Sequence, residues 1–313
     1  MFTGFFYFMK IELKITEEHK GMRIDDLIAK SFDLISRSHA AASVKNGELR
    51  IFKRKIKPGY KVKAGEIIAG SVVLKKDIDV LPQPIDLDVV FEDKYIIVLN
   101  KPPGLVIHPG AGNNSGTLVN ALLNHCPEIK NIGDDLSRAG IIHRLDKDTS
   151  GIIAVAKTEY ALQFLKKEFK YRRVKKRYLA LLKGVIKDDT GAITLPVGRH
   201  PKKRTMMAVK GENLRHAETL WSVKQRFENA TLVEVFLKTG RKHQIRVHFY
   251  ASGYPLMGER VYQFRRVRKK KASIPRQMLH SASLGFSHPF SGKWVSFSAS
   301  IPEDFKSVMG TLN

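Results

Sequence analysis

The sequence predicts an α+β protein of two domains, the second of which is built on a largely antiparallel mixed sheet. A chain of 313 residues has room for about two domains of ordinary size. From residue 89 onward, strand-like runs outnumber helical runs, and the two kinds follow each other in no regular order. This irregular order favours an antiparallel sheet, because parallel sheets come with regular alternation of strands and helices.

A small α+β domain is expected at residues 15–75, after an N-terminal extension at residues 1–14. Apolar residues at helical spacing predict one helix, and Ser36 and Gly47 are suited to begin and end a second. Two strand-like runs, the second with a turn at Ala64-Gly65, complete a β-ribbon. The helices are expected at 21–32 and 36–47, and the strands at 48–52 and 60–74.

An extended linker is expected at residues 76–88, where two prolines stand among alternating charged and apolar residues. The second domain is then expected at residues 89–313. Its strands are predicted at 89–101, 151–158, 178–186, 217–227, 230–239 and 293–301, and its helices at 117–126 and 159–173.

The charge of the chain indicates a nucleic-acid partner. Lys and Arg number 55 against 30 Asp and Glu, a net charge of +25. The excess lies in both domains, since residues 1–75 hold 15 basic and 8 acidic residues. Strong basicity spread over folded domains is typical of nucleic-acid binding. A membrane partner is not expected, because no run approaches the roughly 18 apolar residues of a membrane span.

Several other function classes lack their sequence signatures. The single cysteine, Cys126, excludes an intrachain disulfide and any multi-cysteine zinc site. The spacing of His243 and His248 does not place two metal ligands on one helix face, and no P-loop, dinucleotide motif or nucleophile elbow is present. No cofactor or metal is expected. The apolar N-terminus lacks a basic segment and a cleavage site, so the expected location is cytoplasmic.

The string HRLDKDTSG at 143–151 is the first candidate for chemistry. Short polar side chains and a glycine directly before a strand place the carboxylate of Asp146 at an edge of the sheet. Arg144 and Lys147 flank Asp146, and nearby positive charge keeps a carboxylate ionised, as a nucleophile requires. The alternative is a polar turn in which Asp146 caps backbone amides.

Two further strings stand at 238–248 (KTGRKHQIRVH) and 276–281 (RQMLHS). In the first, Ile245 is apolar, so Arg246 projects from the opposite face of an extended chain or from the start of a helix. Its guanidinium can offer a bidentate fork to a carboxylate. The alternative is a basic loop that faces RNA. In the second string, His280 is either a core histidine or a catalyst.

Together these strings resemble the RluA-type family of RNA pseudouridine synthases, most of all its RluD subgroup, which acts on large-subunit ribosomal RNA. HRLDKDTSG is similar to the nucleophile motif of the family and TGRKHQIRVH to its arginine motif. VLNKPPGLVIHPG at 98–110 and RQMLHSASLGFSHP at 276–289 match the start and end of its catalytic domain. The N-terminal domain resembles the alpha-L RNA-binding domain. The resemblance covers residues 15–305, and Lys242 departs from the Thr or Ser usual in the family.

The resemblance implies a pseudouridine-synthase-type fold and an enzyme that isomerises specific uridines without a cofactor or metal. It implies that Asp146 is the nucleophile, attacking either the ribose anomeric carbon or the uracil ring, and that Arg246 is its partner. Tyr178 matches the tyrosine that stacks on the target base and is a candidate for proton removal. The target uridine must leave its stack to reach Asp146. The implied substrate-binding residues are His143, Arg144, which fills the vacated stack, Arg241, Ile245 and Leu279.

Basic residues in three clusters are expected to contact RNA, although the alternative in each case is a solvated charged face. Arg172 and Arg173 belong to the cluster at 166–177, and a third cluster spans 260–276. A monomer is expected. A noncatalytic RNA- or ribosome-binding protein of the same fold is the alternative function, and a hydrolase using Asp and His a weaker one. The N-terminal residues expected to contact RNA are Arg37, Lys45, Arg50, Lys53, Arg54 and Lys55.

Overall fold

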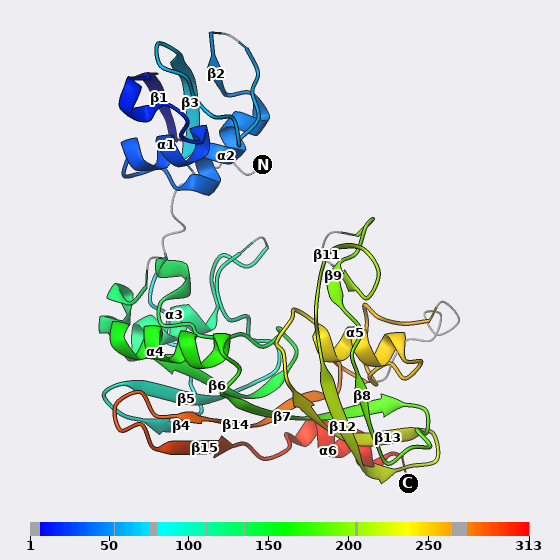
Figure 1. Cartoon of the computed structure of the whole chain (residues 1–313). Helices are drawn as coiled ribbons and strands as arrows, with labels where there is room; N and C mark the ends of the chain where they lie inside the picture. The colour runs from blue at the N-terminus through cyan, green and yellow to red at the C-terminus, as the bar shows by residue number, and fades with distance from the viewer. Residues whose placement is uncertain are drawn as a thin grey trace. The chain divides into compact units, whose positions relative to one another are not determined.

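The chain forms two compact units, Met1–Asp79 and Val80–Asn313 (Figure 1). The computed structural model describes residues 7–52, 54–74, 80–110, 112–133, 135–203, 206–264 and 274–312. Within these ranges, no helix combines the length and the apolar character that crossing a membrane requires.

The first unit is a three-stranded sheet in the order β1-β3-β2 with two helices. As predicted, the side chain of Ser36 caps the second helix by accepting a hydrogen bond from His39 N, and Gly47 ends it in the left-handed conformation. The elements are β1 (Tyr7–Lys14), a 3-10 turn (Glu17–His19), α1 (Ile24–Ser31), α2 (Arg37–Asn46), β2 (Leu49–Ile51) and β3 (Ile67–Leu74).

Two details of this unit differ from the sequence-based expectation. Strand β1 lies in the segment expected as an extension, and it pairs with β3 from Tyr7↔Leu74 to Lys14↔Ile67. Its partner is distant in the sequence, so no local pattern marks this pairing. The expected strand at 60–74 begins only at Ile67, because residues 60–66 form turns and an isolated bridge.

The second unit is built on a nine-stranded sheet in the order β4-β5-β6-β14-β7-β13-β12-β8, with β15 beside β14. Its ladders are antiparallel except for the short parallel pairing of β6 and β14, which confirms a largely antiparallel mixed sheet. The strands are β4 (Val89–Glu92), β5 (Ile96–Lys101), β6 (Ser150–Ala156), β7 (Lys175–Lys183), β8 (Thr190–Ile193), β12 (Thr219–Arg226), β13 (Ala230–Leu237), β14 (Leu279–Ser287) and β15 (Trp294–Ser298).

Helices cover both faces of this sheet. Leu122, Leu165 and Phe249 bring α3 (Leu118–His125), α4 (Glu159–Lys170) and α5 (Gln244–Ala251) into one core cluster, and Phe305 brings α6 (Glu303–Gly310) into another. Alternation along β7 turns Tyr178 toward the first cluster and Leu179 toward the second. Two 3-10 turns (Pro127–Asn131 and Leu136–Arg138) follow α3, and a small sheet of β9 (Val197–Arg199), β10 (Met207–Ala208) and β11 (Glu212–Arg215) extends beyond the large one (Figure 1).

Gly151 fixes the junction at which the loop carrying Asp146 enters the sheet. Its φ is +108°, and an added Cβ would lie 2.7 Å from the carbonyl carbon of Ser281. The two strands meet there through the pairs His280↔Ser150 and Ser281↔Gly151. The last residue of HRLDKDTSG is therefore a glycine because β6 and β14 approach each other too closely for a side chain.

Candidate active site

The two strings that carry the candidate nucleophile and arginine meet at one pocket of about 520 Å³. This volume is within the usual range of ligand pockets, about 300–1,000 Å³. The pocket lies between α4, the start of α5 and strands β7 and β13. Its lining includes all the candidate catalytic and substrate-binding residues, namely Asp146, Tyr178, Arg246, His143, Arg144, Arg241, Ile245 and Leu279.

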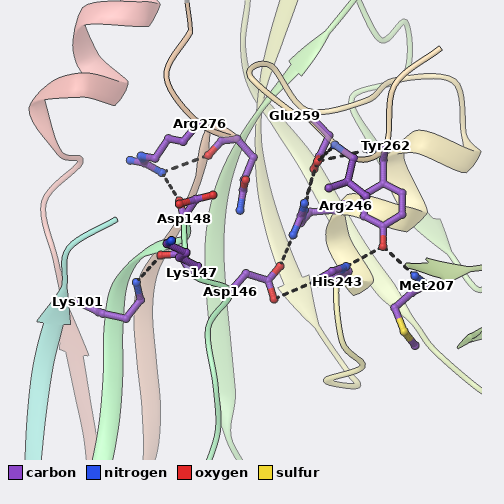
Figure 2. Close-up of polar contacts among 12 residues, drawn as sticks. Lys101, Asp146, Lys147, Asp148, Met207, His243, Arg246, Glu259, Tyr262 and Arg276 are labelled. Carbon is purple, nitrogen blue, oxygen red and sulfur yellow. Dashed lines mark hydrogen bonds and ion pairs between the residues drawn. The ribbon is translucent and has the colours of Figure 1, made fainter. Parts of the chain in front are cut away.

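Asp146 and Arg246 form the centre of the pocket, although 100 residues separate them in the sequence. Arg246 Nη1 donates a hydrogen bond of 2.8 Å to Asp146 Oδ2. The other side of the guanidinium is held by Glu259, which accepts from Nε at 2.7 Å and from Nη2 at 2.8 Å. Figure 2 shows this chain of charges from Glu259 through Arg246 to Asp146. The carboxylate therefore contacts the arginine rather than capping backbone amides.

The electrostatic surroundings keep Asp146 ionised. Burial acts to raise its pKa, but the positive charges of His243, when protonated, and of Arg246 outweigh burial and lower the pKa below its ordinary value. Burial also lowers the pKa of His243 to about 4, so this imidazole is neutral at neutral pH. The charge that keeps Asp146 ionised at that pH is then mainly the charge of Arg246.

His243 lies on the other side of the carboxylate, with Nε2 3.7 Å from Asp146 Oδ1. Its Nδ1 is 2.7 Å from the hydroxyl of Tyr262, which also accepts a hydrogen bond from Met207 N at 2.9 Å (Figure 2). The backbone of His243 is left-handed, with φ 56°, and the residue is the N-cap of α5. The sequence predicted neither this contact nor the one between Tyr262 and Met207.

Tyr178 projects into the pocket from β7, opposite Ser281 of β14. Burial, with a smaller contribution from the negative charge of Asp146, raises the pKa of Tyr178 to about 12. The phenol is therefore protonated at neutral pH. Its ring can stack on a base, whereas removal of a proton by Tyr178 would first require deprotonation of its own hydroxyl.

The implied substrate-binding residues have different settings around the pocket. The ring of His143 stacks on Phe169 at 4.8 Å, and its Nε2 accepts a hydrogen bond from Ala154 N. Burial lowers the pKa of His143 to about 3, so it is a neutral wall. Arg144 is exposed, and Arg241 Nε donates to His216 O. The buried apolar walls are Ile245 and Leu279.

Two buried basic side chains hold the loop that carries Asp146. Lys101 Nζ donates to the carbonyl oxygens of Pro102, Leu105 and Lys147 at 2.7–3.0 Å. Arg276 donates to the carbonyl oxygen of Asp148 at 3.1 Å and pairs with Asp304 through two nitrogens. Lys147 and Asp148 directly follow the candidate nucleophile, so its backbone is fixed from two directions (Figure 2).

The residues expected to contact RNA have different surroundings in the structure. Arg172 lines the pocket, but Arg173 does not; it pairs with Glu168 at 2.6 Å. Of the cluster at 260–276, Arg276 is buried and paired, so the expectation that it faces RNA is wrong for this residue, and 265–273 lie outside the described residues. In the first unit, Lys53 lies outside the described residues, and the remaining candidates are Arg37, Lys45, Arg50, Arg54 and Lys55.

His280 is a core histidine, one of the two alternatives for the third string. It is 1% exposed, its Nδ1 is 3.0 Å from Ser150 Oγ, and its Nε2 is 3.2 Å from Ala299 O. Among the residues that the structure describes, no group of three or more His, Cys, Asp and Glu side chains is placed to hold a metal ion.

Glu259 is the most important residue that sequence reasoning missed, although a signal for it exists. A buried arginine requires a carboxylate partner, and Glu259 is the first acidic residue after Arg246 in the sequence. His243 drew attention only as a possible metal ligand. Lys101 and Arg276 stand in matched strings but bind backbone carbonyls, which leave no mark in the sequence.

Comparisons with known families match a different family to each of the two units of the chain. The model of the RNA pseudouridylate synthase family matches residues 95–251, and the model of the S4 domain matches residues 22–68. Among solved structures, human RNA pseudouridylate synthase domain containing 1 has a TM-score of 0.56 and 25% identity, covering 74% of this chain and 96% of that one.

Three curated relatives match nearly the whole chain. An uncharacterised RNA pseudouridine synthase of Bacillus subtilis is 39% identical, covering 97% of this chain and 98% of its own length. The ribosomal large subunit pseudouridine synthase D of Neisseria meningitidis serogroup B is 40% identical over 97% of this chain and 82% of its own length. The protein of the same name from Yersinia pestis is 38% identical over 97% and 95%.

Proposed function

The chain belongs to the RNA pseudouridylate synthase family, and from this premise we propose that it acts on large-subunit ribosomal RNA with Asp146 as its nucleophile. Membership makes the chain an isomerase that converts uridine in RNA to pseudouridine. The target RNA is inferred from relatives named for the large ribosomal subunit, which match this chain over nearly its whole length.

The reaction breaks the bond from the ribose anomeric carbon to N1 of uracil and makes one to C5. The proton on C5 is lost and N1 gains one, so no atoms are added or removed and no external reagent is consumed. Asp146 attacks either the anomeric carbon or the uracil ring, which lets the base detach, turn and reattach. An ionised carboxylate is required for either attack.

The observation that carries the proposal is the chain Glu259–Arg246–Asp146 at a pocket of nucleoside size. Arg246 keeps the carboxylate charged and oriented. Tyr178, whose hydroxyl is protonated, offers its ring for stacking. A flipped-out uridine would stand between this ring and Asp146, with Arg144 at its exposed position filling the vacated stack.

The N-terminal unit is proposed to add RNA affinity rather than chemistry. It includes the match to the S4 domain and none of the residues that line the pocket. Asp25 is buried and pairs with Arg23 at 2.8 Å and with Arg37 at 3.5 Å, so these guanidinium groups are held in place before RNA arrives.

Mapping of pseudouridine tests both parts of the proposal. Carbodiimide-dependent reverse-transcription stops are compared between ribosomal RNA of wild-type cells and of cells that lack the gene. Loss of one or more stops in large-subunit RNA, restored by the wild-type gene but not by the Asp146→Asn gene, is expected. Stops lost only from other RNAs would show that the proposed target is wrong.

A further inference from the structure

We propose that His243 is a positioning residue for the nucleophile, because its ring is held so that the Nε2–H group faces the oxygen of Asp146 that attacks the substrate. This inference rests on the proposed role of Asp146. It assigns a function to a largely buried imidazole that lies beside Asp146, next to the carboxylate oxygen that Arg246 does not bind.

The two oxygens of Asp146 are not equivalent. Oδ2 accepts a hydrogen bond of 2.8 Å from Arg246 Nη1. Oδ1 accepts no hydrogen bond within the described part of the chain, and His243 Nε2 lies 3.7 Å from it. An oxygen that is already bound to a guanidinium has less electron density to donate, so Oδ1 is the oxygen available for attack.

The hydrogen bonds around Tyr262 favour one tautomer of His243, the one that carries its proton on Nε2. The Tyr262 hydroxyl oxygen accepts from Met207 N at 2.9 Å, so its own proton is free for His243 Nδ1, 2.7 Å away. A neutral imidazole that accepts at Nδ1 carries its hydrogen on Nε2. We therefore assign the proton to Nε2, the nitrogen that faces Asp146.

The imidazole is neutral in this setting. Burial lowers the pKa of His243 to about 4; the negative charge of Asp146 opposes this, and Arg246 and Lys242 add to it. Glu259 opposes it further, and Tyr262, whose pKa burial raises to about 12, remains a phenol. A neutral N–H donor orients a carboxylate without neutralising its charge, as a full positive charge at this position would tend to do.

The distance of 3.7 Å is longer than a hydrogen bond. Contacts of this kind often tighten only when the substrate is bound. A shift of the carboxylate toward His243 would bring Oδ1 into hydrogen-bond range and restrict its rotation. Because a neutral N–H group withdraws less electron density than a charged guanidinium does, Oδ1 would remain the oxygen available for attack. The left-handed backbone at φ 56°, which is uncommon outside glycine, places the ring at the point where this can occur.

Two substitutions separate a positioning role from a purely structural one. In His243→Gln, the side-chain amide can place an N–H group close to the position of Nε2. In His243→Asn the amide is too short, but Asn tolerates the left-handed conformation better than Gln does. If His243 acts through its N–H group, the Gln variant should therefore be the more active one. If it serves only the backbone turn, the Asn variant should be the more active one.

The measurement is the single-turnover rate of pseudouridine formation at saturating RNA, with RNA affinity measured in parallel. We expect His243→Asn to lower the rate by about 10- to 100-fold and His243→Gln by less than about 5-fold. Affinity should change by less than about 3-fold in both, since neither change removes a charge that is present at neutral pH. Tyr262→Phe, which removes the hydroxyl that fixes the tautomer, should lie between them.

The pH profile supplies a second measurement. Loss of the N–H donor leaves the ionised form of Asp146 less stable and so raises its pKa. The acidic limb of the rate should therefore move to higher pH in His243→Asn. In the control His248→Gln it should stay in place, because His248 is buried on the same helix but binds Leu195 O instead of Asp146.

The outcomes distinguish the inference from the function on which it rests. A His243→Asn enzyme at least as fast as His243→Gln, with an unmoved acidic limb, would mean that His243 serves only the backbone turn. If wild-type protein forms no pseudouridine, the proposed function fails. If Asp146→Asn retains turnover, the role of Asp146 fails and the role of His243 with it.

Discussion

Arg246 binds Asp146 with only one of its three guanidinium nitrogens, because Glu259 holds the other two. The contact to Asp146 Oδ2 is 2.8 Å, and the two contacts to Glu259 are 2.7 and 2.8 Å. Glu259 in turn accepts from the backbone N–H groups of Val261 and Tyr262. The proposed nucleophile is therefore oriented by an arginine that Glu259 holds in place.

Asp146→Asn should abolish turnover and leave RNA affinity within a few-fold, because it removes the attacking charge and keeps the shape. The check is single-turnover pseudouridine formation together with an RNA-binding titration. Asp148→Asn makes the same charge change two residues away and should remain active, since Arg276 contacts its backbone oxygen. Turnover by the Asp146→Asn protein would remove this residue from the chemistry.

Arg246→Lys should lower the single-turnover rate by about 10- to 150-fold, the cost of a hydrogen bond to a charged group. Lysine cannot bind Glu259 with two nitrogens and Asp146 with a third. The matched control is Arg226→Lys, because the guanidinium of Arg226 likewise binds several oxygens, those of Ile186, Lys187 and Asp189, but lies away from the pocket, at the loop after β7. Equal rates for wild type and Arg246→Lys would make Arg241 the better candidate partner.

Local patterns in the sequence predicted much of this arrangement but not its long-range contacts. Asp146 and Arg246 could be predicted because each stands in a string that matches a family motif. The pairing of β6 with β14 could not, because Gly151 meets Ser281 across 130 residues of sequence and only the folded sheet shows why glycine is required. Strand β1 was missed for the same reason, since its partner is β3.

Two site residues were hidden for a different physical reason. A lysine or histidine in the sequence gives no indication of its burial. In the structure Lys101 is 1% exposed and binds the loop that carries Asp146, and His243 lies beside Asp146 with its side chain 14% exposed. Their partners are backbone oxygens and a tyrosine hydroxyl, which many residues could supply. Such contacts become visible only in three dimensions.

Lys101→Met should destabilise the fold, because it removes the buried donor that three carbonyl oxygens share; of these, within the described residues, only that of Lys147 has another donor, Gly104 N. The expected loss of unfolding free energy is about 2 kcal/mol or more, from the cost of unpaired buried polar groups. Thermal unfolding followed by circular dichroism measures it. Lys157→Met, which breaks an ion pair with the carboxylate of Glu92, should cost less. Equal melting temperatures for Lys101→Met and wild type would contradict this role.

RNA affinity should weaken as the pH rises from 7 to 9, with Lys176 as the cause. Burial, together with the charges of Arg172 and Arg241, lowers the pKa of Lys176 to about 8, and its side chain lines the pocket. Above that pH the ammonium loses its proton and no longer attracts phosphate. Lys176→Arg should remove this dependence, because arginine stays charged, whereas Lys175→Arg should retain it. Titrations of RNA at a series of pH values test this, and a wild-type affinity that is flat over the range would exclude Lys176 from RNA binding.

A chain that begins at Val80 should keep the chemistry and lose part of the RNA affinity. Val80 is the first residue to retain, because it is 4% exposed and packs in the core of the second unit. This chain lacks the first unit, whose Arg37, Lys45, Arg50, Arg54 and Lys55 are expected to contact phosphates, but keeps every residue that lines the pocket. Each lost phosphate contact lowers the slope of log affinity against log salt by about 0.7 to 0.9, so the slope should be shallower by about two to four. The rate at saturating RNA should fall less than the affinity, because Asp146, Tyr178 and Arg246 remain in place.

A cooperative thermal transition must first show that the shortened chain folds. In a folded chain, an unchanged salt slope would mean that the first unit makes no phosphate contacts.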